Sequence, residues 1–399
     1  MTTKEADEVD FFNTLPDDII VSILCRLTIS EAARTSILSV RWRHLWTFFS
    51  ASLDFDASNI LHRLRLCERH DDHERVSLEE ELDGFKRIVY KVLNSLQAQT
   101  LESFLLCFDV VGSDGDIDNW VQFAIQKRVK KLVVDLVPSY LAYFPTYEHC
   151  VVPPSLVNLS SLPCLRVLRL SHVDVSGKDV KNFLSSCPLL ETLSVVSSRK
   201  MKRLKICDSH AKLRELEIRQ CFNLQRVEIS CGSLVSFTYT GRPTGINYVR
   251  VPNLREVVFG GARVDHTFTN FFRSIGYDHS QYLRVLKLEL YLTFQFWKVR
   301  DLDGPFICTE VHALDWLQEV KLIGFCDGNS DVAFIQYIIE NATNLKKLIV
   351  DPISPLYPTF TFEDEVISQT TNDDFTARII RMHELLVPLI PPCVEFVIL

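Results

Sequence analysis

The most regular feature of the chain is a short pattern of apolar and variable positions that recurs along most of its length. Each copy has an apolar residue, two variable residues, an apolar residue, one variable residue and a final apolar residue, as in LRVLRL from Leu165. The last apolar pair has a period of two, which predicts a short strand with one buried face. Ten copies occur, and they begin at Leu101, Val129, Leu165, Leu190, Leu213, Leu234, Leu254, Leu283, Leu317 and Leu345.

Repetition of one strand pattern predicts an array of stacked repeats. Successive copies begin 20 to 36 residues apart. This spacing is close to or somewhat above that of leucine-rich repeats, so the longer intervals contain insertions. Repeats of this kind bury their apolar faces only against their neighbours. The pattern therefore predicts a solenoid with a parallel sheet along one wall and unlike ends.

The segments between the copies predict a mixed opposite wall. Three of them have helical periodicity, namely KDVKNFLSSC from Lys178, TFTNFFRSIG from Thr267 and DVAFIQYIIENA from Asp331. Two others, MKRLKI from Met201 and LQRVEI from Leu224, leave too few residues before the next copy for a helix. We predict that these two segments are strands of the outer wall.

The first 50 residues lack the repeat and have the pattern of a compact unit of three helices. Thr14 with Asp17 predicts a capping box for the first helix, and EAARTSIL from Glu31 predicts the second. Ser39 is a good N-cap residue for the third. The first helix has an apolar stripe made of Ile20, Ile23, Leu24 and Leu27, and the third has one made of Trp42, Leu45, Trp46 and Phe49.

Two further segments lie outside the repeats. The charge-dense segment ERHDDHERVSLEEE from Glu68 is predicted to be a solvated loop or a frayed helix between the helical unit and the array. The tail from Asp373, DDFTARIIRMHELLVPLI followed by VEFVIL, predicts a helix and a strand that cap the array. The complete pattern is that of an α/β protein.

Composition and charge narrow the class of function. Apolar residues make up 47% and charged residues 24%, which is typical of globular proteins. The net charge is −8 and no long basic run occurs, which argues against nucleic-acid binding. The polar, acidic start MTTKEADEVD is not a secretory signal, and no apolar run is long enough to span a membrane. We therefore expect a cytoplasmic or nuclear protein whose twelve cysteines are mostly small buried apolar residues rather than disulfides.

No set of residues in the sequence has the arrangement that catalysis or metal binding requires. Cys67, His70 and His73 are close together but lack a fourth ligand. His149 and Cys150 are adjacent, so their side chains do not face each other, and nothing orients them. We predict a protein that is not an enzyme and has no metal or cofactor.

The N-terminal unit is recognisable. LPDDIIVSILCRLTISEAARTSILSVRWRHLW, from Leu15 to Trp46, resembles an F-box through its Leu-Pro-Asp opening and its Ser-x-Arg-Trp-Arg-x-Leu-Trp close. Three later segments resemble landmarks of the plant F-box proteins with leucine-rich repeats and a C-terminal FBD region. They are LDFD from Leu53, DIDNWVQFAIQKRVKKLVVDL from Asp116 and LQEVKLIGFCDGNSDVAFIQYIIENATNLKKLIVDP from Leu317.

The resemblance and the patterns together give the expected domain organisation. The fold class is α/β, with a small three-helix F-box followed by an irregular leucine-rich-repeat solenoid. The expected domains are 10–50 F-box, 51–99 connector with helix, 100–310 leucine-rich-repeat solenoid, 311–352 FBD-like terminal repeats and 353–399 C-terminal cap.

The resemblance implies an adaptor of an SCF-type ubiquitin ligase. In that family the F-box binds an SKP-type protein, which joins a cullin scaffold and a RING subunit, and the repeats hold the protein to be ubiquitinated. Thr28 stands where the family commonly has proline and Val40 where lysine is usual, so a lower affinity for the SKP-type partner is expected. The docking residues implied by family position are Leu15, Pro16, Ile19, Ile23, Leu24, Leu38, Trp42 and Leu45.

The eight docking positions have a second interpretation, because some of them must pack the three helices together. A unit of this size buries little apolar surface alone, so part of that surface is expected to face a partner. Arg41 and Arg43 are predicted to be rim charges that steer an acidic partner.

The identity of the substrate cannot be read from the repeats, but their outward positions indicate where it would bind. These positions carry mixed charges, at Arg214, Glu215, Glu217, Arg255, Glu256, Arg284 and Lys287. Their alternative interpretation is a solvated sheet face. The insertions PSYLAYFPTYEHCVVPP from Pro138 and TFQFWKVRDLDGPF from Thr293 are equally good contact loops, because Tyr and Trp favour interfaces. The alternative function is a non-degradative interaction scaffold whose F-box does not engage an SKP-type protein.

Overall fold

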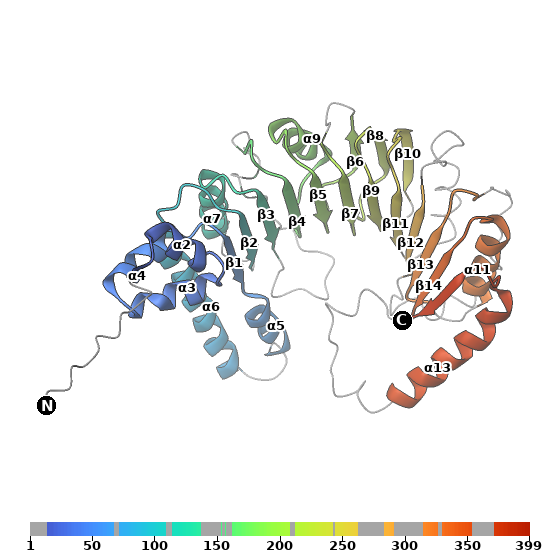
Figure 1. The fold of residues 1–399 in the computed structure, drawn as a ribbon, viewed down its shortest axis with the longest axis horizontal. Helices are drawn as coiled ribbons and strands as arrows, with labels where there is room; N and C mark the ends of the chain where they lie inside the picture. Colours follow the sequence, from blue (N-terminus) through green and yellow to red (C-terminus); the bar gives the residue numbers. More distant parts are fainter. Residues whose placement is uncertain are drawn as a thin grey trace, which may run out of the picture. The chain divides into compact units, whose positions relative to one another are not determined.

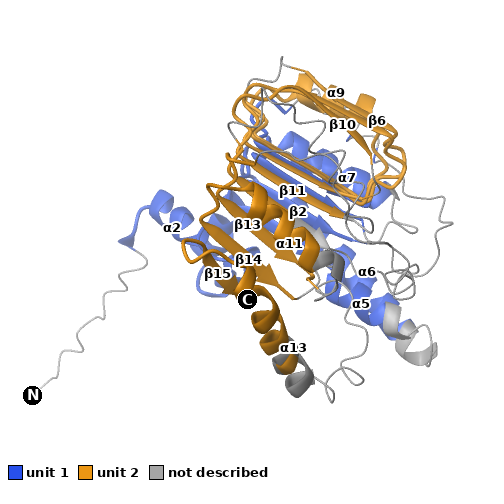
Figure 2. Cartoon of the chain, turned by 90° about the vertical axis from the view of Figure 1, so that its right-hand side faces the viewer, with its two compact units in different colours: residues 1–172 blue, residues 173–399 orange. Residues whose placement is uncertain are grey.

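The structure is a computed structural model that divides into two compact units, residues 1–172 and residues 173–399 (Figure 2). It describes residues 14–67, 72–108, 114–136, 153, 156, 162–207, 212–241, 244–261, 283–290, 314–325, 329–352 and 371–399.

The first unit combines helices with a short parallel sheet (Figure 1). Its helices are α2 (Asp17–Leu24), α3 (Ile29–Arg34), α4 (Val40–Leu45), α5 (Ser58–Cys67), α6 (Asp72–Ser95) and α7 (Asp114–Gln126). Its strands are β1 (Ser52–Asp56), β2 (Ser103–Cys107), β3 (Lys131–Asp135) and β4 (Val167–Ser171). The four strands pair in parallel and in chain order. Strand β1 was not among the predicted repeats, because Ser50 stands where the pattern has its first apolar residue.

Side-chain hydrogen bonds cap two of the three N-terminal helices, α3 and α4. Helix α4 begins after Ser39, whose hydroxyl oxygen accepts a hydrogen bond from the N–H of Trp42 at 3.2 Å, as predicted. The predicted capping box of Thr14 with Asp17 is wrong, because α2 begins only at Asp17, with Pro16 as an extended N-cap residue. A cap at Thr14 would make Leu15 the first residue of the helix. Leu15 precedes Pro16, and the residue before a proline is disfavoured from the helical conformation.

The charge-dense connector is helical in the part that the structure describes, which was one of its two predicted alternatives. Helix α6 runs for 24 residues from Asp72 to Ser95. Leu78, Val89 and Leu93 are buried on one side of it, while its neighbouring Glu residues are exposed. An apolar stripe at helical spacing is thus hidden within a sequence that is highly charged overall.

The second unit has a longer parallel sheet made of the remaining repeats. Its strands are β5 (Thr192–Val196), β7 (Glu215–Arg219), β9 (Ser236–Thr240), β11 (Glu256–Gly261), β12 (Val285–Leu290), β13 (Glu319–Ile323), β14 (Lys347–Asp351) and β15 (Glu395–Ile398). They pair in this order, and the first residues of neighbouring strands are register partners. All ten predicted repeat strands of the chain are confirmed, as is the C-terminal strand that caps them.

The opposite wall of the second unit is mixed, as predicted. Strands β6 (Arg203–Ile206), β8 (Arg226–Ser230) and β10 (Gly245–Arg250) form a parallel sheet of their own, in the order β10-β8-β6. The first two confirm the predicted outer-wall strands, and β10 was missed because Pro243 stands where the other two motifs begin with Met201 and Leu224. Helices α9 (Gly177–Ser186), α11 (Asn329–Asn341) and α13 (Thr371–Leu386) confirm three predicted helices. The predicted helix from Thr267 lies outside the described residues.

The apolar side chains of the two walls form one core. The inward residues of the repeat strands are almost completely buried, and so are Leu204, Val227 and Tyr248 of the outer sheet. The rings of Phe237 and Tyr248 meet edge to face with centroids 5.9 Å apart. The core therefore extends continuously from the repeat strands to the outer sheet.

Cysteines contribute to this core. Cys187 and Cys221 are buried, and burial raises the pKa of both thiols to about 11. Cys107 and Cys231 are buried as well, whereas Cys393 is exposed. The interpretation of the cysteines as small apolar core residues therefore applies to these four.

The ends of several repeat strands share an unusual backbone conformation. His172, Ser197 and Gln220 directly follow β4, β5 and β7, and each has a φ between 53° and 57°. Gly324 directly follows β13 with a φ of 78°. The left-handed conformation turns the chain out of the sheet at the same point of these four repeats. It is a repeated element that the apolar pattern does not reveal.

Candidate protein-docking surfaces

The N-terminal unit has a small core in which one tryptophan has a central place. Trp42 is 6% exposed and Leu45 is 3% exposed, while Ile20, Leu24 and Phe49 are fully buried. These residues come from α2, α4 and the turn that follows α4, so they hold the helices together. The predicted stripe of the third helix is therefore largely a core stripe, and Trp46 at its edge is half-buried.

The structure divides the eight predicted docking residues into two groups. Leu24, Trp42 and Leu45 are core residues of the unit. The other five are at least partly accessible, with Leu15 half-buried and the remainder exposed, namely Pro16, Ile19, Ile23 and Leu38. The core interpretation thus applies to three members, and docking stays a prediction for the other five.

The exposed apolar side chains lie on α2 and on the short segment that leads into α4. Leu38 is 64% exposed, and its neighbours Ile37 and Val40 are 84% and 78% exposed. Ile19 and Ile23 are exposed on one side of α2. Sequence analysis missed Ile37 and treated Val40 only as a departure from the family pattern. Both lie off the apolar stripes of the helices, which is the signal that could have marked them as surface residues. We call these five residues the apolar docking surface.

Arg41 has a role within the unit. Its Nε donates a hydrogen bond to Oδ1 of Asp17 at 2.8 Å, and a second N–H donates to the carbonyl oxygen of Leu15. These contacts fix the start of α2 against α4. Arg43 is exposed, as expected for a rim charge.

In the second unit, four of the seven predicted substrate residues are occupied by contacts within the sheet face. Glu215 accepts a hydrogen bond from the hydroxyl of Thr192 at 3.0 Å. Glu256 forms an ion pair with Lys287, with 2.6 Å between Oε1 and Nζ. Glu217 forms an ion pair with Arg219, two residues along the same strand. These contacts connect neighbouring strands or stiffen one strand, as cross-strand pairs do in other sheets.

The other three predicted substrate residues lie together at the starts of the strands. Arg214, Arg255 and Arg284 each occupy the position directly before the first residue of β7, β11 or β12. All three are exposed. The three arginines thus lie directly before the strands, whereas the other four predicted residues lie within the strands.

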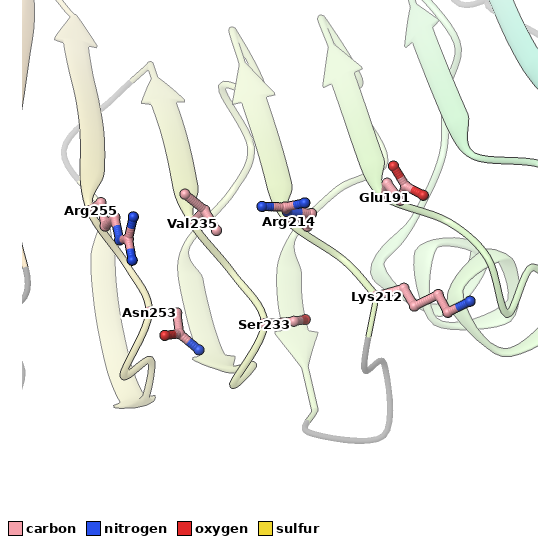
Figure 3. Close-up of a pocket in the computed structure, with 7 residues that line it drawn as sticks. All are labelled: Glu191, Lys212, Arg214, Ser233, Val235, Asn253 and Arg255. Carbon is pink, nitrogen blue, oxygen red and sulfur yellow. The ribbon is translucent and has the colours of Figure 1, made fainter.

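Two of these arginines line a shallow pocket of about 480 Å³ (Figure 3). Figure 3 shows Arg214 and Arg255 on two strands with Val235 on the strand between them. Ser233 donates to the carbonyl oxygen of Leu213 at 2.7 Å, and Asn253 donates to that of Gly232 at 2.6 Å. The remaining lining residues are Glu191 and Lys212. The pocket has three cationic side chains and one carboxylate.

The described part of the chain offers little for chemistry. None of its residues form a group of three or more side chains that could hold a metal ion. No described helix is long and apolar enough to cross a membrane. His70, His149 and Cys150 lie outside the described residues. So do the two insertions proposed as contact loops, apart from Pro153 in the first.

Three family models match the chain in the predicted order. The F-box domain matches residues 12–50. A leucine-rich-repeat domain, At1g61320/AtMIF1, matches residues 92–259, and FBD matches residues 314–350. The chain therefore combines an F-box, leucine-rich repeats and an FBD region, which confirms the resemblance seen in the sequence.

Individual proteins of Arabidopsis thaliana have the same make-up. The chain is 33% identical to the FBD-associated F-box protein At3g52670, over 52% of this chain and 50% of the relative. It is 32% identical to the F-box/FBD/LRR-repeat protein At4g00160, over 50% of this chain and 47% of the relative. It is 25% identical to the F-box/FBD/LRR-repeat protein At1g13570, over 93% and 82%. The chain thus spans about half the length of the first two relatives and most of the third. F-box and leucine-rich-repeat domains support a substrate-recognition adaptor role in general.

Proposed function

We propose that the protein is the substrate-recognition adaptor of an SCF-type ubiquitin ligase. The observation that carries this proposal is the apolar docking surface on a unit that matches the F-box. Five apolar side chains are exposed there while Trp42 and Leu45 are buried inside the same unit. Because exposed apolar patches on small units mark protein interfaces, this surface would dock the SKP-type protein. Cullin and RING subunits would join through that partner.

The proposed adaptor acts by proximity and is not an enzyme. The repeat region of the second unit would hold the protein to be ubiquitinated. One of its lysines would then be near the activated ubiquitin carried by the conjugating enzyme. Holding two reactants together converts a bimolecular encounter into a local one, and no side chain of the adaptor needs to react.

Binding of the full chain to a recombinant SKP-type protein tests the docking surface. We expect Leu38→Glu to weaken binding at least about tenfold, because it places a charge in an apolar interface. Ile88→Glu is the matched control, since Ile88 is 61% exposed on α6, outside the matched F-box residues. Thermal unfolding of both variants should stay close to that of the wild type, because neither residue is in the core. Absence of binding by the wild type, or equal binding by Leu38→Glu, would contradict the proposal.

The second candidate function is a non-degradative scaffold. The departure at Thr28 favours it, because Thr28 is exposed on the unit that would dock the partner. A scaffold would bind its partner protein through the repeats but would not bind the SKP-type protein at micromolar concentrations. We also propose a cytoplasmic or nuclear location, which imaging of a fluorescent fusion in plant cells tests.

A further inference from the structure

The starts of the strands in the second unit form a regular row. The carbonyl oxygen of Arg214 accepts hydrogen bonds from the N–H groups of both Val235 and Ser236, at 2.8 and 2.9 Å. The carbonyl oxygens of Val235 and Arg255 accept in the same way from the first residues of the next repeat. The same pair of hydrogen bonds recurs at each step from β5 to β14, and its first acceptor is Glu191, directly before β5. We call the residues that it joins from Arg214 onward the strand-start row, namely Arg214, Val235, Arg255, Arg284, Gln318 and Lys346.

The strand-start row is basic, although the whole chain is acidic. Four of its six members are Arg or Lys, and the other two, Val235 and Gln318, are uncharged. All four cationic residues are exposed. The whole chain has a net charge of −8. The positive charge of this row therefore does not follow from the composition of the chain.

Two carboxylates of the sheet face near this row are paired with lysines outside it. Glu256 pairs with Lys287 at 2.6 Å, and Glu395 pairs with Lys347 at 2.8 Å. Within the described part of the chain, the four cationic side chains of the row form no ion pair. Their charge is therefore available to a ligand.

The spacing of the row matches an extended peptide. Neighbouring strands of a sheet are about 4.8 Å apart. Arg214 and Arg255, two strands apart, are therefore separated by about 10 Å, and Arg284 lies about 5 Å further on. An extended chain rises about 3.3 Å per residue, so carboxylates three residues apart are also separated by about 10 Å. About eight residues of such a peptide would cover the row from Arg214 to Lys346.

We propose that the strand-start row binds an extended acidic segment of a partner protein, in which Asp or Glu residues three positions apart meet Arg214 and Arg255. The arginines would accept the carboxylates in two-pronged hydrogen bonds, for which the guanidinium is suited. The pocket between Arg214 and Arg255 would hold the side chains that point toward the sheet (Figure 3). This inference rests on the proposed function, since the segment would belong to the protein to be ubiquitinated.

The acidic residues beside the row favour a sparse acidic peptide over a polyphosphate chain. Glu215, Glu256 and Glu319 follow the row at the first positions of their strands. A nucleic acid carries a phosphate charge every few ångströms, so it would place phosphates against these carboxylates. A peptide with widely spaced carboxylates meets the arginines and leaves the glutamates opposite its neutral residues.

Fluorescence anisotropy with the full-length chain tests the proposal. The probe is a labelled decapeptide with Glu at every third position and Gly or Ser between, in about 0.05 M salt. We expect saturable binding, no binding of the same peptide with Gln in place of Glu, and weakening by at least about tenfold in Arg255→Gln/Arg284→Gln. Arg203→Gln/Arg226→Gln is the matched control, because these exposed arginines are register partners on the outer sheet. It should change the affinity by less than about twofold.

Three outcomes would overturn the inference. The first is that the Glu peptide shows no saturable binding, and the second is that the two double variants weaken its binding equally. The third is that a single-stranded oligonucleotide displaces the labelled peptide at a lower concentration than the unlabelled peptide does. Binding to the SKP-type protein is measured on the same variants. Arg255→Gln/Arg284→Gln should keep that binding, and Leu38→Glu should keep peptide binding. Failure of the peptide proposal is thus distinguishable from failure of the adaptor proposal.

Discussion

Gly177 lies directly against the carbonyl group of Arg203, so that a Cβ atom at position 177 would be only 2.0 Å from the carbonyl oxygen. Gly177 is the first residue of α9, and Arg203 is the first residue of β6 at the edge of the outer sheet. The absence of a side chain lets the helix approach the edge strand. The contact therefore depends on the size of this residue rather than on its backbone freedom.

Gly177→Ala should destabilise the second unit. The new methyl group would meet backbone rather than a flexible side chain, so α9 or β6 must move, at a cost of about 1–3 kcal/mol. We expect a lower midpoint of thermal unfolding and faster hydrogen exchange in β6. The control is Gly245→Ala on β10, where no atom lies within 4 Å of the new Cβ. Equal midpoints for Gly177→Ala and the wild type would show that the contact is not tight.

Thr28 and Glu31 form a reciprocal cap at the start of α3. The N–H and the hydroxyl of Thr28 both donate to Oε2 of Glu31 at 2.8 Å, and the N–H of Glu31 donates to the hydroxyl oxygen at 3.3 Å. Thr28→Ala should lower the free energy of unfolding by about 1 kcal/mol at neutral pH. Ser30→Ala, an exposed change on the same helix, should have little effect.

The stabilisation by this cap should depend on pH. The hydrogen bonds from Thr28, that of its N–H first, lower the pKa of Glu31 below the ordinary value of 4.5. A carboxyl group with a lowered pKa in the folded state stabilises the fold above its unfolded pKa, and this contribution is lost as the pH falls through the folded pKa. The difference between wild type and Thr28→Ala in urea unfolding should therefore be full at pH 7 and narrow below about pH 4.5. A constant difference across this range would show that Glu31 does not take part.

Arg128 is in a left-handed conformation, with a φ of 49°, just after α7. Its N–H donates to the carbonyl of Ile125 at 3.0 Å, and the N–H of Val129 donates to that of Ala124 at 3.4 Å, which is the pattern of a Schellman cap. Arg128→Gly should raise the free energy of unfolding by about 1 kcal/mol, because glycine adopts this conformation without strain. The same change at exposed Arg87, within α6, should lower it by about 1 kcal/mol. Chemical denaturation with circular dichroism distinguishes the two signs.

Sequence reasoning predicted the repeat strands well, because each strand carries its own signal. The three apolar residues of LRELEI from Leu213 are buried and the residues between them are exposed or half-buried, and in-register stacking repeats this pattern in the other copies. Strand β10 lacks the first apolar residue of the pattern, since position 243 is Pro. Strand β10 forms because it pairs with the edge of β8, a contact between segments that the local sequence pattern does not encode.

The docking residues were harder to predict for a related reason. Trp42 and Leu38 are both apolar residues near the third helix, and sequence alone gives no measure of which one faces inward. The hydrogen bond between Ser39 and Trp42 sets the rotation of α4, so that Trp42 enters the core while Leu38 remains exposed. For a similar reason, the sequence alone could not show that Arg255 and Glu256 differ in their contacts. These adjacent residues have different contacts, because the side chain of Lys287 on the neighbouring strand pairs with Glu256 and not with Arg255.

The strands β11 and β12 remain in register from Glu256 and Val285 onward, although more residues separate them along the chain than separate β7 from β9. Lengthening a connection costs little free energy once the strands are aligned. Connections can therefore be exchanged between homologous proteins, or grafted in the laboratory, without disturbing the ladder. Such exchange would let related proteins differ in the surfaces that their connections form while the strands of the sheet stay the same.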